Sequence, residues 1–255
     1  MLKSSIDRDA LAQFLAQELQ ISRFRDYCPN GLQVEGRNDI ARIVSGVTAC
    51  QALLDEAVRL GADAILVHHG YFWRGEDMRL LGNKYRRIKT LMAHEISLFA
   101  YHLPLDTHPD LGNNAQLARR LGLLPEGRFG EDELGWLGQM GGASIRTVAE
   151  LAVHIEQSLG RSPTVIGNPE QRLGKLAWCT GAAQNMLGAA IEAGANVYLS
   201  GEISEPTVHL ARESQVAYLA CGHHATELYG VQAVGALLQE KFGIEHIFVD
   251  IANPV

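Results

Sequence analysis

Two stretches of this sequence repeat each other at a separation of 133 residues, without a gap. Residues 43–67 and 176–200 each begin and end with a short apolar segment, and between them a glutamine, a leucine, an alanine and a Gly-Ala pair fall at matched positions. The glycine ends a predicted helix in each copy. Each copy therefore has the strand, helix, strand order of a parallel sheet. Since these features look alike in any α/β protein, a chance match is the alternative to a duplicated α/β lobe.

Two adjacent histidines end the second predicted strand of the first copy. Residues 64–67 are all apolar, which suits a strand buried on both faces, and His68-His69-Gly70 follows directly. In open α/β sheets ligands bind beyond the carboxyl ends of the strands, so these imidazoles are placed for metal or substrate chemistry. The alternative is that one histidine packs in the core and the other is solvated.

A later predicted strand in each half also ends at ligand-type residues. His102-x-x-x-Asp106 follows the strand at residues 97–101, and His223-x-x-x-Glu227 follows the strand at residues 216–221. Glu202 occupies the repeat position of His69, although an ordinary surface carboxylate is its alternative. Two similar lobes facing a central cleft would gather these strand ends into one site. The candidates are then His68, His69, His102, Asp106, His223, His224 and Glu227.

This set of side chains predicts metal chemistry. Imidazole and carboxylate are the ligands that zinc, iron and manganese favour, and no thiolate is needed. Several such ligands shared by two lobes predict two divalent ions, with a carboxylate such as Glu227 suited to bridge them. Paired ions polarise an oxygen and lower the pKa of water, so hydrolysis is the expected reaction class. The tandem His223-His224 can pack as readily as ligate, so the prediction rests on the repetition at matched strand ends.

The expected domain organisation is an α/β lobe at residues 1–124 and a second at residues 125–255. Residues 125–145 are rich in glycine and are the best linker candidate. Helices are predicted over residues 7–20, 51–60, 83–94, 113–121 and 147–159, the second opened by a capping box at Thr48-Ala49-Cys50-Gln51. The strand at residues 244–251 can close the second lobe or return to the first.

Composition disfavours several classes of function. A formal net charge of −7 argues against a broad nucleic-acid surface. The four cysteines are widely spaced and form no C-x-x-C, so a disulfide framework or cysteine-bound zinc is not expected. No apolar run is long enough to span a membrane and the N-terminus lacks a signal-peptide core, which predicts a cytoplasmic protein. G-x-S-x-G, P-loop and G-x-G-x-x-G motifs are absent.

Six motifs together resemble those of a known family. They are Pro29-Asn30-Gly31-Leu32-Gln33-Val34, Gly46-Val47-Thr48, His68-His69-Gly70, His102 to Asp106, Gly201-Glu202 and Gly222-His223-His224-Ala225-Thr226-Glu227. With these motifs the chain resembles the GTP cyclohydrolase type 2-like family, also called the Ngg-interacting-factor-three-like family, from about residue 26 to Pro254. It is most similar to the short bacterial members.

The resemblance implies a two-lobed α/β subunit, a dinuclear metal site and a ring-shaped homohexamer, a toroid with its sites facing the interior. It assigns two divalent ions per subunit, of unknown identity, to five ligands, with Glu227 as the bridge. These are His68, His69, Asp106, His223 and Glu227. Many members have threonine at the position of Leu103, so His102 can act beside the ligands rather than as one. The stretch at residues 125–172 is too short for the domain that longer members insert, so no inserted domain is expected.

Three functions follow as hypotheses. The first is a metal-dependent hydrolase that acts on a nucleotide or related small molecule, with GTP ring opening as its specific version and His102 and His224 as proton shuttles. The alternative is a non-catalytic metal-binding ring that serves as a scaffold or regulatory partner. DNA binding is a third, which the net charge disfavours.

Overall fold

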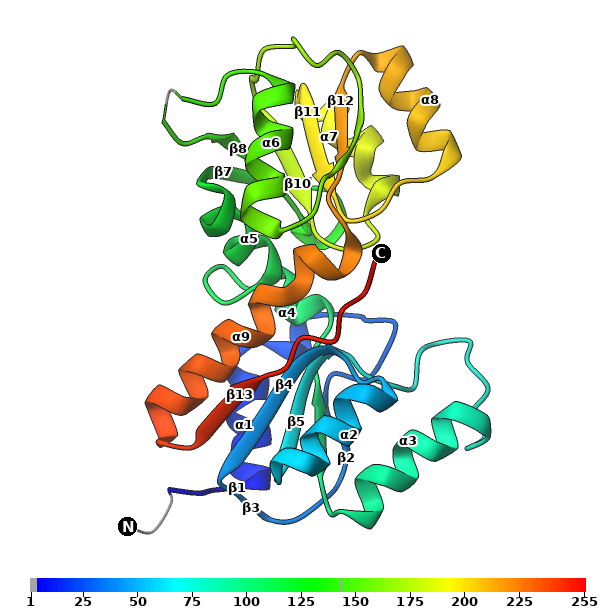
Figure 1. Cartoon of the computed structure of the whole chain (residues 1–255), viewed down its shortest axis with the longest axis vertical. Coiled ribbons are helices and arrows are strands. Elements are labelled where there is room, and N and C mark those ends of the chain that lie inside the picture. Colours follow the sequence, from blue (N-terminus) through cyan, green and yellow to red (C-terminus); the bar gives the residue numbers. More distant parts are fainter. Residues whose placement is uncertain (1–3, 143) are drawn as a thin grey trace. The chain divides into compact units, whose positions relative to one another are not determined.

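The computed structural model describes residues 4–142 and 144–255. These residues form two compact units (Figure 1). The first consists of the described residues up to Leu111 together with Gly230–Ala252, and the second of Gly112–Tyr229 with Asn253–Val255. Helix α9 (His223–Phe242) begins in the second unit and ends in the first. Both units are mixed α/β structures, as the sequence predicts.

The first unit is built on a five-stranded sheet with the strand order β13-β4-β5-β6-β2. Strands β13, β4, β5 and β6 are parallel to their neighbours, and β2 runs antiparallel to β6. The other described elements are four helices and the later part of α9, one 3-10 turn and a short ribbon of β1 and β3. The bounds are β1 Ile6–Asp7, α1 Arg8–Glu18, η1 Ile21–Arg23, β2 Gly31–Val34, β3 Asp39–Ile40, β4 Arg42–Thr48, α2 Gln51–Leu60, β5 Ala64–His69, α3 Gly82–Ala93, β6 Ser97–Ala100, α4 Leu103–Thr107 and β13 Glu245–Phe248.

Alternate residues of these strands face two separate apolar layers. Leu66 and Phe99 pack with α1 and the later part of α9, whereas Ile65, Val67 and Leu98 pack with α2 and α3. Figure 1 shows α2 and α3 together on one face of this sheet. A sheet covered on both faces needs apolar residues at every strand position, which explains the continuous run at residues 64–67.

The second unit has a six-stranded sheet with the strand order β7-β8-β10-β11-β12-β9. Strands β10, β11 and β12 are parallel, and β8 and β9 run antiparallel to β10 and β12. Helices α5 and α6 pack on one face of the sheet and α7 and α8 on the other. The bounds are α5 Asn113–Leu121, β7 Leu123–Phe129, η2 Glu131–Glu133, β8 Gly135–Met140, α6 Val148–Leu159, β9 Thr164–Ile166, β10 Leu176–Cys179, η3 Gln184–Met186, α7 Leu187–Glu192, β11 Val197–Ser200, α8 Glu205–Ser214 and β12 Ala217–Ala220.

The internal repeat is present in the pairing of the strands. Ile43 pairs with Ala64 in the first unit, and Leu176 pairs with Val197 in the second, so the separation of 133 residues holds across both strands. In both units a third parallel strand follows, and an antiparallel strand from earlier in the chain covers its outer edge. The fold is therefore two similar α/β units.

Two expectations about local structure are wrong. Residues 125–145 are no linker, because β7 and β8 form an antiparallel hairpin there that extends the second sheet. Thr48 does not cap α2: it is the last residue of β4, Cys50 holds the cap position without a side-chain hydrogen bond, and the Thr48 hydroxyl contacts His69 instead. A capping box occurs instead at the start of α6. There the Thr147 side chain accepts a hydrogen bond from the Glu150 N–H, and the Glu150 side chain accepts one from the Thr147 N–H.

The C-terminal strand, whose lobe the sequence left open, belongs to the first sheet: β13 pairs in parallel with β4. The chain enters the second unit after Leu111 and leaves it within α9, whereas the sequence placed the change of lobe between residues 124 and 125. Among the residues that the structure describes, no helix combines the length and the apolar character needed to cross a membrane.

Candidate metal centre

The first unit gathers four of the candidate residues at the carboxyl ends of β5 and β6. His68 and His69 are the last residues of β5, His102 follows β6, and Asp106 lies on the short helix α4. His68 is fully buried, and its Nε2 lies 3.4 Å from Asp106 Oδ1. The ring centroid of His68 lies 4.5 Å from that of His69 and 5.1 Å from that of His102. One nitrogen from each of these three imidazoles falls within 4.8 Å of the others.

Each of these imidazoles is held through Nδ1 by an oxygen. His68 Nδ1 lies 2.9 Å from the Tyr101 carbonyl oxygen, and His69 Nδ1 lies 3.1 Å from Thr48 Oγ1. His102 Nδ1 lies 2.7 Å from Asp26 Oδ1. A histidine whose Nδ1 is held in this way binds a metal or exchanges a proton through Nε2.

The second unit holds the other three candidates in the first turns of α9. His223 and Glu227 are four residues apart, which places both on one face of the helix, with His223 Nε2 3.1 Å from Glu227 Oε2. Glu202, which follows β11, places Oε1 2.7 Å from His223 Nδ1. Burial acts to lower the pKa of His223, but the hydrogen bonds and charges of Glu227 and Glu202 outweigh it and raise that pKa to about 9.

A glycine forms the floor of this second set. The Gly181 N–H donates to Thr226 Oγ1 at 3.1 Å, which fixes the loop after β10 against the first turn of α9. A Cβ atom at Gly181 would overlap Glu227 Oε1 and would lie 3.2 Å from His223 Nε2. The backbone has φ +69°, a left-handed value that glycine adopts without strain. Only glycine leaves this carboxylate its space.

The donor sets suit divalent metal ions. In metal proteins a ligating histidine nearly always donates a hydrogen bond from its second ring nitrogen to a carboxylate, a carbonyl or another oxygen. This bond fixes the orientation of the ring and its tautomer. His68, His69 and His223 all have such a partner at Nδ1. With Asp106 and Glu227 they provide the nitrogen and oxygen donors that zinc, iron and manganese accept. The candidate ligands therefore form two sets, one in each unit.

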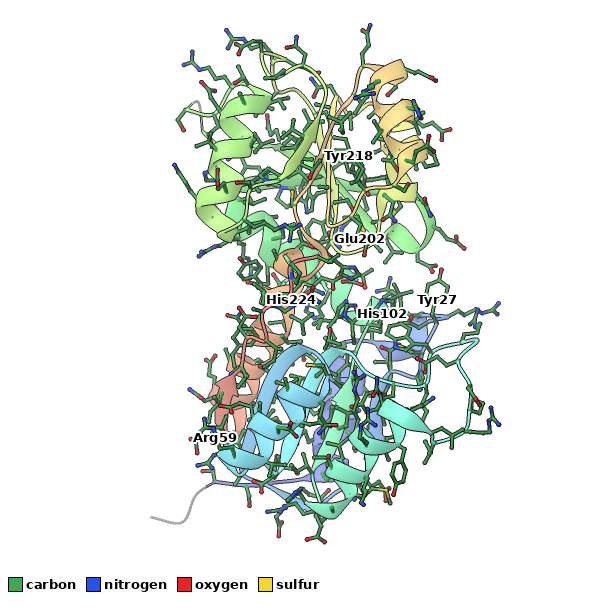
Figure 2. The ribbon with its side chains drawn as sticks, turned by 45° about the vertical axis from the view of Figure 1, so that its right-hand side comes forward. Tyr27, Arg59, His102, Glu202, Tyr218 and His224 are labelled. Carbon is green, nitrogen blue, oxygen red and sulfur yellow. The ribbon has the colours of Figure 1, made fainter. Side chains whose placement is uncertain are left out.

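The structure gives partial answers for the remaining predicted residues. Glu202, which is labelled in Figure 2 and for which the sequence left a surface role open, has its Oε1 2.7 Å from Nδ1 of His223 in the ligand set. His224 lies beside His223 at the start of α9, and its main-chain N–H donates to the Val255 carbonyl at 3.0 Å. The two H-x-x-x-carboxylate motifs are not at equivalent positions in the two sheets. Ala100 and Ala220 occupy equivalent pairing positions in β6 and β12, but His102 is the second residue after Ala100 and His223 is the third after Ala220.

Sequence reasoning missed the residues that hold the imidazoles. Asp26 and the Tyr101 carbonyl come from positions without any recognisable motif, and Thr48, which lies in one of the family motifs, was expected to cap a helix rather than to hold His69. Gly181 was missed too, although it is the repeat counterpart of Thr48 and is the second residue after the conspicuous strand β10. Of these four, Thr48 and Gly181 carried a usable signal, because they occupy matched positions at the ends of the repeated strands.

Comparisons with known proteins agree with this fold and this set of motifs. The family model for Duf34/NIF3 (NGG1p interacting factor 3) matches residues 6–254. A "GTP cyclohydrolase 1 type 2 homolog" of Pseudomonas aeruginosa is 53% identical over 239 residues, which cover 92% of this chain and 94% of that relative. A protein of the same name from Escherichia coli is 48% identical over 248 residues, covering 96% and 98%.

A solved structure described as "protein ybgI, unknown function" has the same fold, with a TM-score of 0.93. It is 46% identical in sequence, and the match covers 98% of this chain and 100% of that one. The family model spans nearly the whole chain, and its relatives match over almost their full lengths. The chain therefore belongs to the Duf34/NIF3 (NGG1p interacting factor 3) family.

Proposed function

We propose that this chain binds two divalent metal ions and uses them to hydrolyse a nucleotide or a related small molecule. The proposed ligands are His68, His69, Asp106, His223 and Glu227, with Glu227 bridging the two ions. The observation that carries the proposal is the oxygen partner at Nδ1 of each of the three ligand histidines, which is the arrangement typical of histidines that bind a metal through Nε2. The identity of the ions stays open among zinc, iron and manganese.

The chain's own residues divide the work of such a site. A divalent ion bound there supplies Lewis acidity, which polarises an oxygen of the substrate and favours deprotonation of water. His102 stands beside His68 and His69, and with Nδ1 on Asp26 it accepts or donates a proton through Nε2. His224, next to the ligand His223, is the second proposed proton carrier.

The proposed substrate class comes from the relatives. Several are named GTP cyclohydrolase 1 type 2 homolog, which makes a purine nucleotide the first substrate to examine and ring opening the first reaction. The family also includes a structure described as of unknown function, so the screen should not stop at GTP. Nucleotides and phosphoesters with other leaving groups belong in the same assay.

The test of catalysis uses the purified protein loaded separately with zinc, iron and manganese. We expect turnover of at least one nucleotide or phosphoester, and we expect His102→Gln to reduce it by about 100-fold or more, as loss of a proton-transferring group does. His209→Gln is the matched control, because His209 is exposed and contacts only Glu205 on its own helix among the contacts described. Absence of turnover with every metal and substrate would contradict the proposal.

One observation favours the non-catalytic alternative. Helix α3 and the loop before it expose several large apolar side chains in the first unit, which a protein partner would cover. They are Met78, Leu81, Tyr85 and Met92. On this alternative the protein is a metal-binding scaffold, and a partner should be captured with metal and lost with a chelator. Such a partner, found for a protein that shows no turnover, would favour the scaffold.

Two further expectations from the sequence stay predictions. The homohexamer implied by the family resemblance predicts a particle of about six chain masses, which light scattering during gel filtration measures. The cytoplasmic location predicts that fractionated cells hold the protein with cytoplasmic markers. A monomer in the first experiment would remove the ring from both functional proposals.

A further inference from the structure

A buried carboxylate that belongs to neither ligand set stands behind His102. The Asp26 side chain is 2% exposed, and its Oδ1 lies 2.7 Å from His102 Nδ1. Asp26 precedes β2 and lies 76 residues away from His102 in the sequence. It accepts this bond at the same end of the sheet where β5 and β6 present their histidines.

Other hydrogen bonds fix both oxygens of this carboxylate. Oδ1 accepts from the Tyr27 N–H at 2.6 Å, and Oδ2 accepts from Asn30 Nδ2 at 2.8 Å and from the Leu103 N–H at 2.9 Å. Asn30 Oδ1 in turn accepts from the His102 N–H at 2.7 Å. The segment at residues 26–30 therefore holds both the backbone and the ring of His102. A carboxylate with so many donors has one orientation only.

The ring of His102 is also enclosed by aromatic side chains. Trp73 packs edge to face at 4.9 Å between centroids, and Tyr27 lies at 6.4 Å on the same end of the first unit (Figure 2). One ring nitrogen of His102 lies within 4.8 Å of a ring nitrogen of His68 and of one of His69. Because Nδ1 is bonded to Asp26, we assign Nε2 to this group. Packing and hydrogen bonding together thus direct Nε2 toward the candidate ligands.

A separate metal site built from Asp26, Cys28 and His102 is the competing interpretation, since their donor atoms lie within 4.8 Å of one another. The hydrogen bonds oppose it, because the Asp26 oxygens already accept four of them. Burial also raises the pKa of the Cys28 thiol to about 12, whereas the thiolate is the form that binds metals. The arrangement suits orientation of His102 rather than metal binding.

We propose that Asp26 is a positioning residue, which locks His102 in the tautomer with hydrogen on Nδ1 and keeps Nε2 directed at the metal ligands. This inference rests on the proposed function for the role of His102 in proton transfer. The orientation itself is a property of the folded chain and can be measured without turnover. The proposal therefore has two independent tests.

The first test measures the tautomer directly. Solid-state NMR of protein labelled with ¹⁵N-histidine distinguishes protonated from unprotonated ring nitrogens, and His102→Gln identifies the His102 signals by their loss. We expect hydrogen on Nδ1 in the wild type and a mixture of tautomers in Asp26→Asn. Asp63→Asn is the matched control, because Asp63 is also well buried and accepts two backbone N–H bonds away from the histidines. An unchanged His102 tautomer in Asp26→Asn would overturn the proposal.

A second variant protects this test against a failure to fold. Asn30→Ala keeps the Asp26 charge but removes one donor to Oδ2 and the acceptor of the His102 N–H. We expect it to shift the tautomer in the same direction, by a smaller amount. Two metal ions should remain in both variants and in Cys28→Ser. Loss of metal from Cys28→Ser would show instead that Asp26, Cys28 and His102 form a metal site.

The second test asks whether Asp26 acts through His102. Replacing a residue that orients a functional histidine typically costs about 10- to 100-fold in activity. We expect Asp26→Asn to lower kcat by that factor with little change in KM, and Asp26→Glu to recover part of it. In the His102→Gln background, Asp26→Asn should cost nothing more. Full additivity would contradict the positioning role, whereas absence of turnover in the wild type would count against the proposed function and leave the NMR result standing.

Discussion

The backbone at Gly181 lies close to the side chains of the second ligand set. Its φ of +69° already favours glycine, and the absent side chain leaves the space that the Glu227 carboxylate fills. The two demands are independent, because one concerns the torsion of Gly181 and the other the position of a ligand oxygen. A substitution there combines backbone strain with displacement of the carboxylate.

We predict that Gly181→Ala weakens metal binding more than it weakens the fold. The left-handed backbone should cost about 1–2 kcal/mol of unfolding free energy. Gly160→Ala is the control, since Gly160 has φ +71° with nothing within 4 Å of an added Cβ. Urea unfolding should show similar losses for both variants, while titration with zinc should show weaker binding for Gly181→Ala alone. Equal zinc affinity in the two variants would refute the role of Gly181.

At this scale the sequence indicates the candidate ligands, whereas it gives little indication of the groups that hold them. His68, His69 and the two histidine–carboxylate motifs stand at strand ends, which hydrophobic patterning locates. The partner of His102 comes from 76 residues earlier, and that of His68 is a backbone carbonyl. A carbonyl has no residue type to recognise, and a distant aspartate becomes a partner only when the sheet forms. Glu202 was within reach of sequence reasoning because the repeat supplied its position.

At the scale of elements, the repeat carried the most reliable information. The separation of 133 residues holds for β4 with β5 and for β10 with β11, so the two strand pairs have the same register. Register follows from which residues alternate toward the core, and this alternation is visible in the sequence. The hairpin of β7 and β8 was not predicted, because its many glycines are also typical of a linker. Gly138 is needed where the strands approach closely, as a Cβ atom there would overlap the Leu124 carbonyl, and the register shifts between Pro125 and Gly127.

The corrected caps lead to a prediction about helix stability. Thr147→Ala should lower the free energy of unfolding by about 1 kcal/mol, because it removes the capping bond of α6 to the Glu150 N–H. Thr48→Ala removes no cap from α2 and instead removes the hydroxyl partner of His69 Nδ1. We therefore expect Thr147→Ala to lower the free energy of unfolding, and Thr48→Ala to change the affinity for zinc measured by titration. The reverse assignment would show that the box at Thr48 does form.

The contact between β4 and β13 predicts how stability depends on pH. Burial lowers the pKa of His246, whose Nε2 lies 2.7 Å from Ser45 Oγ. The unfolded chain therefore binds a proton at His246 as pH falls through about 6.5, while the folded chain resists it. The unfolded state binds more protons there, so this contribution is complete above that pH and declines below it.

Denaturant unfolding between about pH 7 and pH 5 measures this contribution. His246→Gln should flatten the dependence of the unfolding free energy on pH relative to the wild type. The exposed His209 provides the control, and His209→Gln should keep the slope of the wild type. An identical slope in His246→Gln would show that other groups govern the acid sensitivity.

At the scale of the whole molecule, the two units each supply one set of candidate ligands. The sequence predicts both units and both sets, but it gives no sign of where the chain returns to the first. That return occurs inside α9, between Tyr229 and Gly230, where the helix continues without a break. The helix has no proline and continues through Gly230, so sequence patterning predicts one uninterrupted helix there rather than a boundary. The division into separately folding domains stays a prediction.

The metal content of the whole chain tests the central claim most directly. Elemental analysis of protein purified without chelators should find two divalent ions per chain in the wild type and one or none in Glu227→Gln. Glu205→Gln, which alters an exposed carboxylate of α8, should retain two. Retention of two ions in Glu227→Gln would contradict the bridging role, and a wild type without bound metal, also after incubation with zinc, iron and manganese, would contradict the metal centre itself.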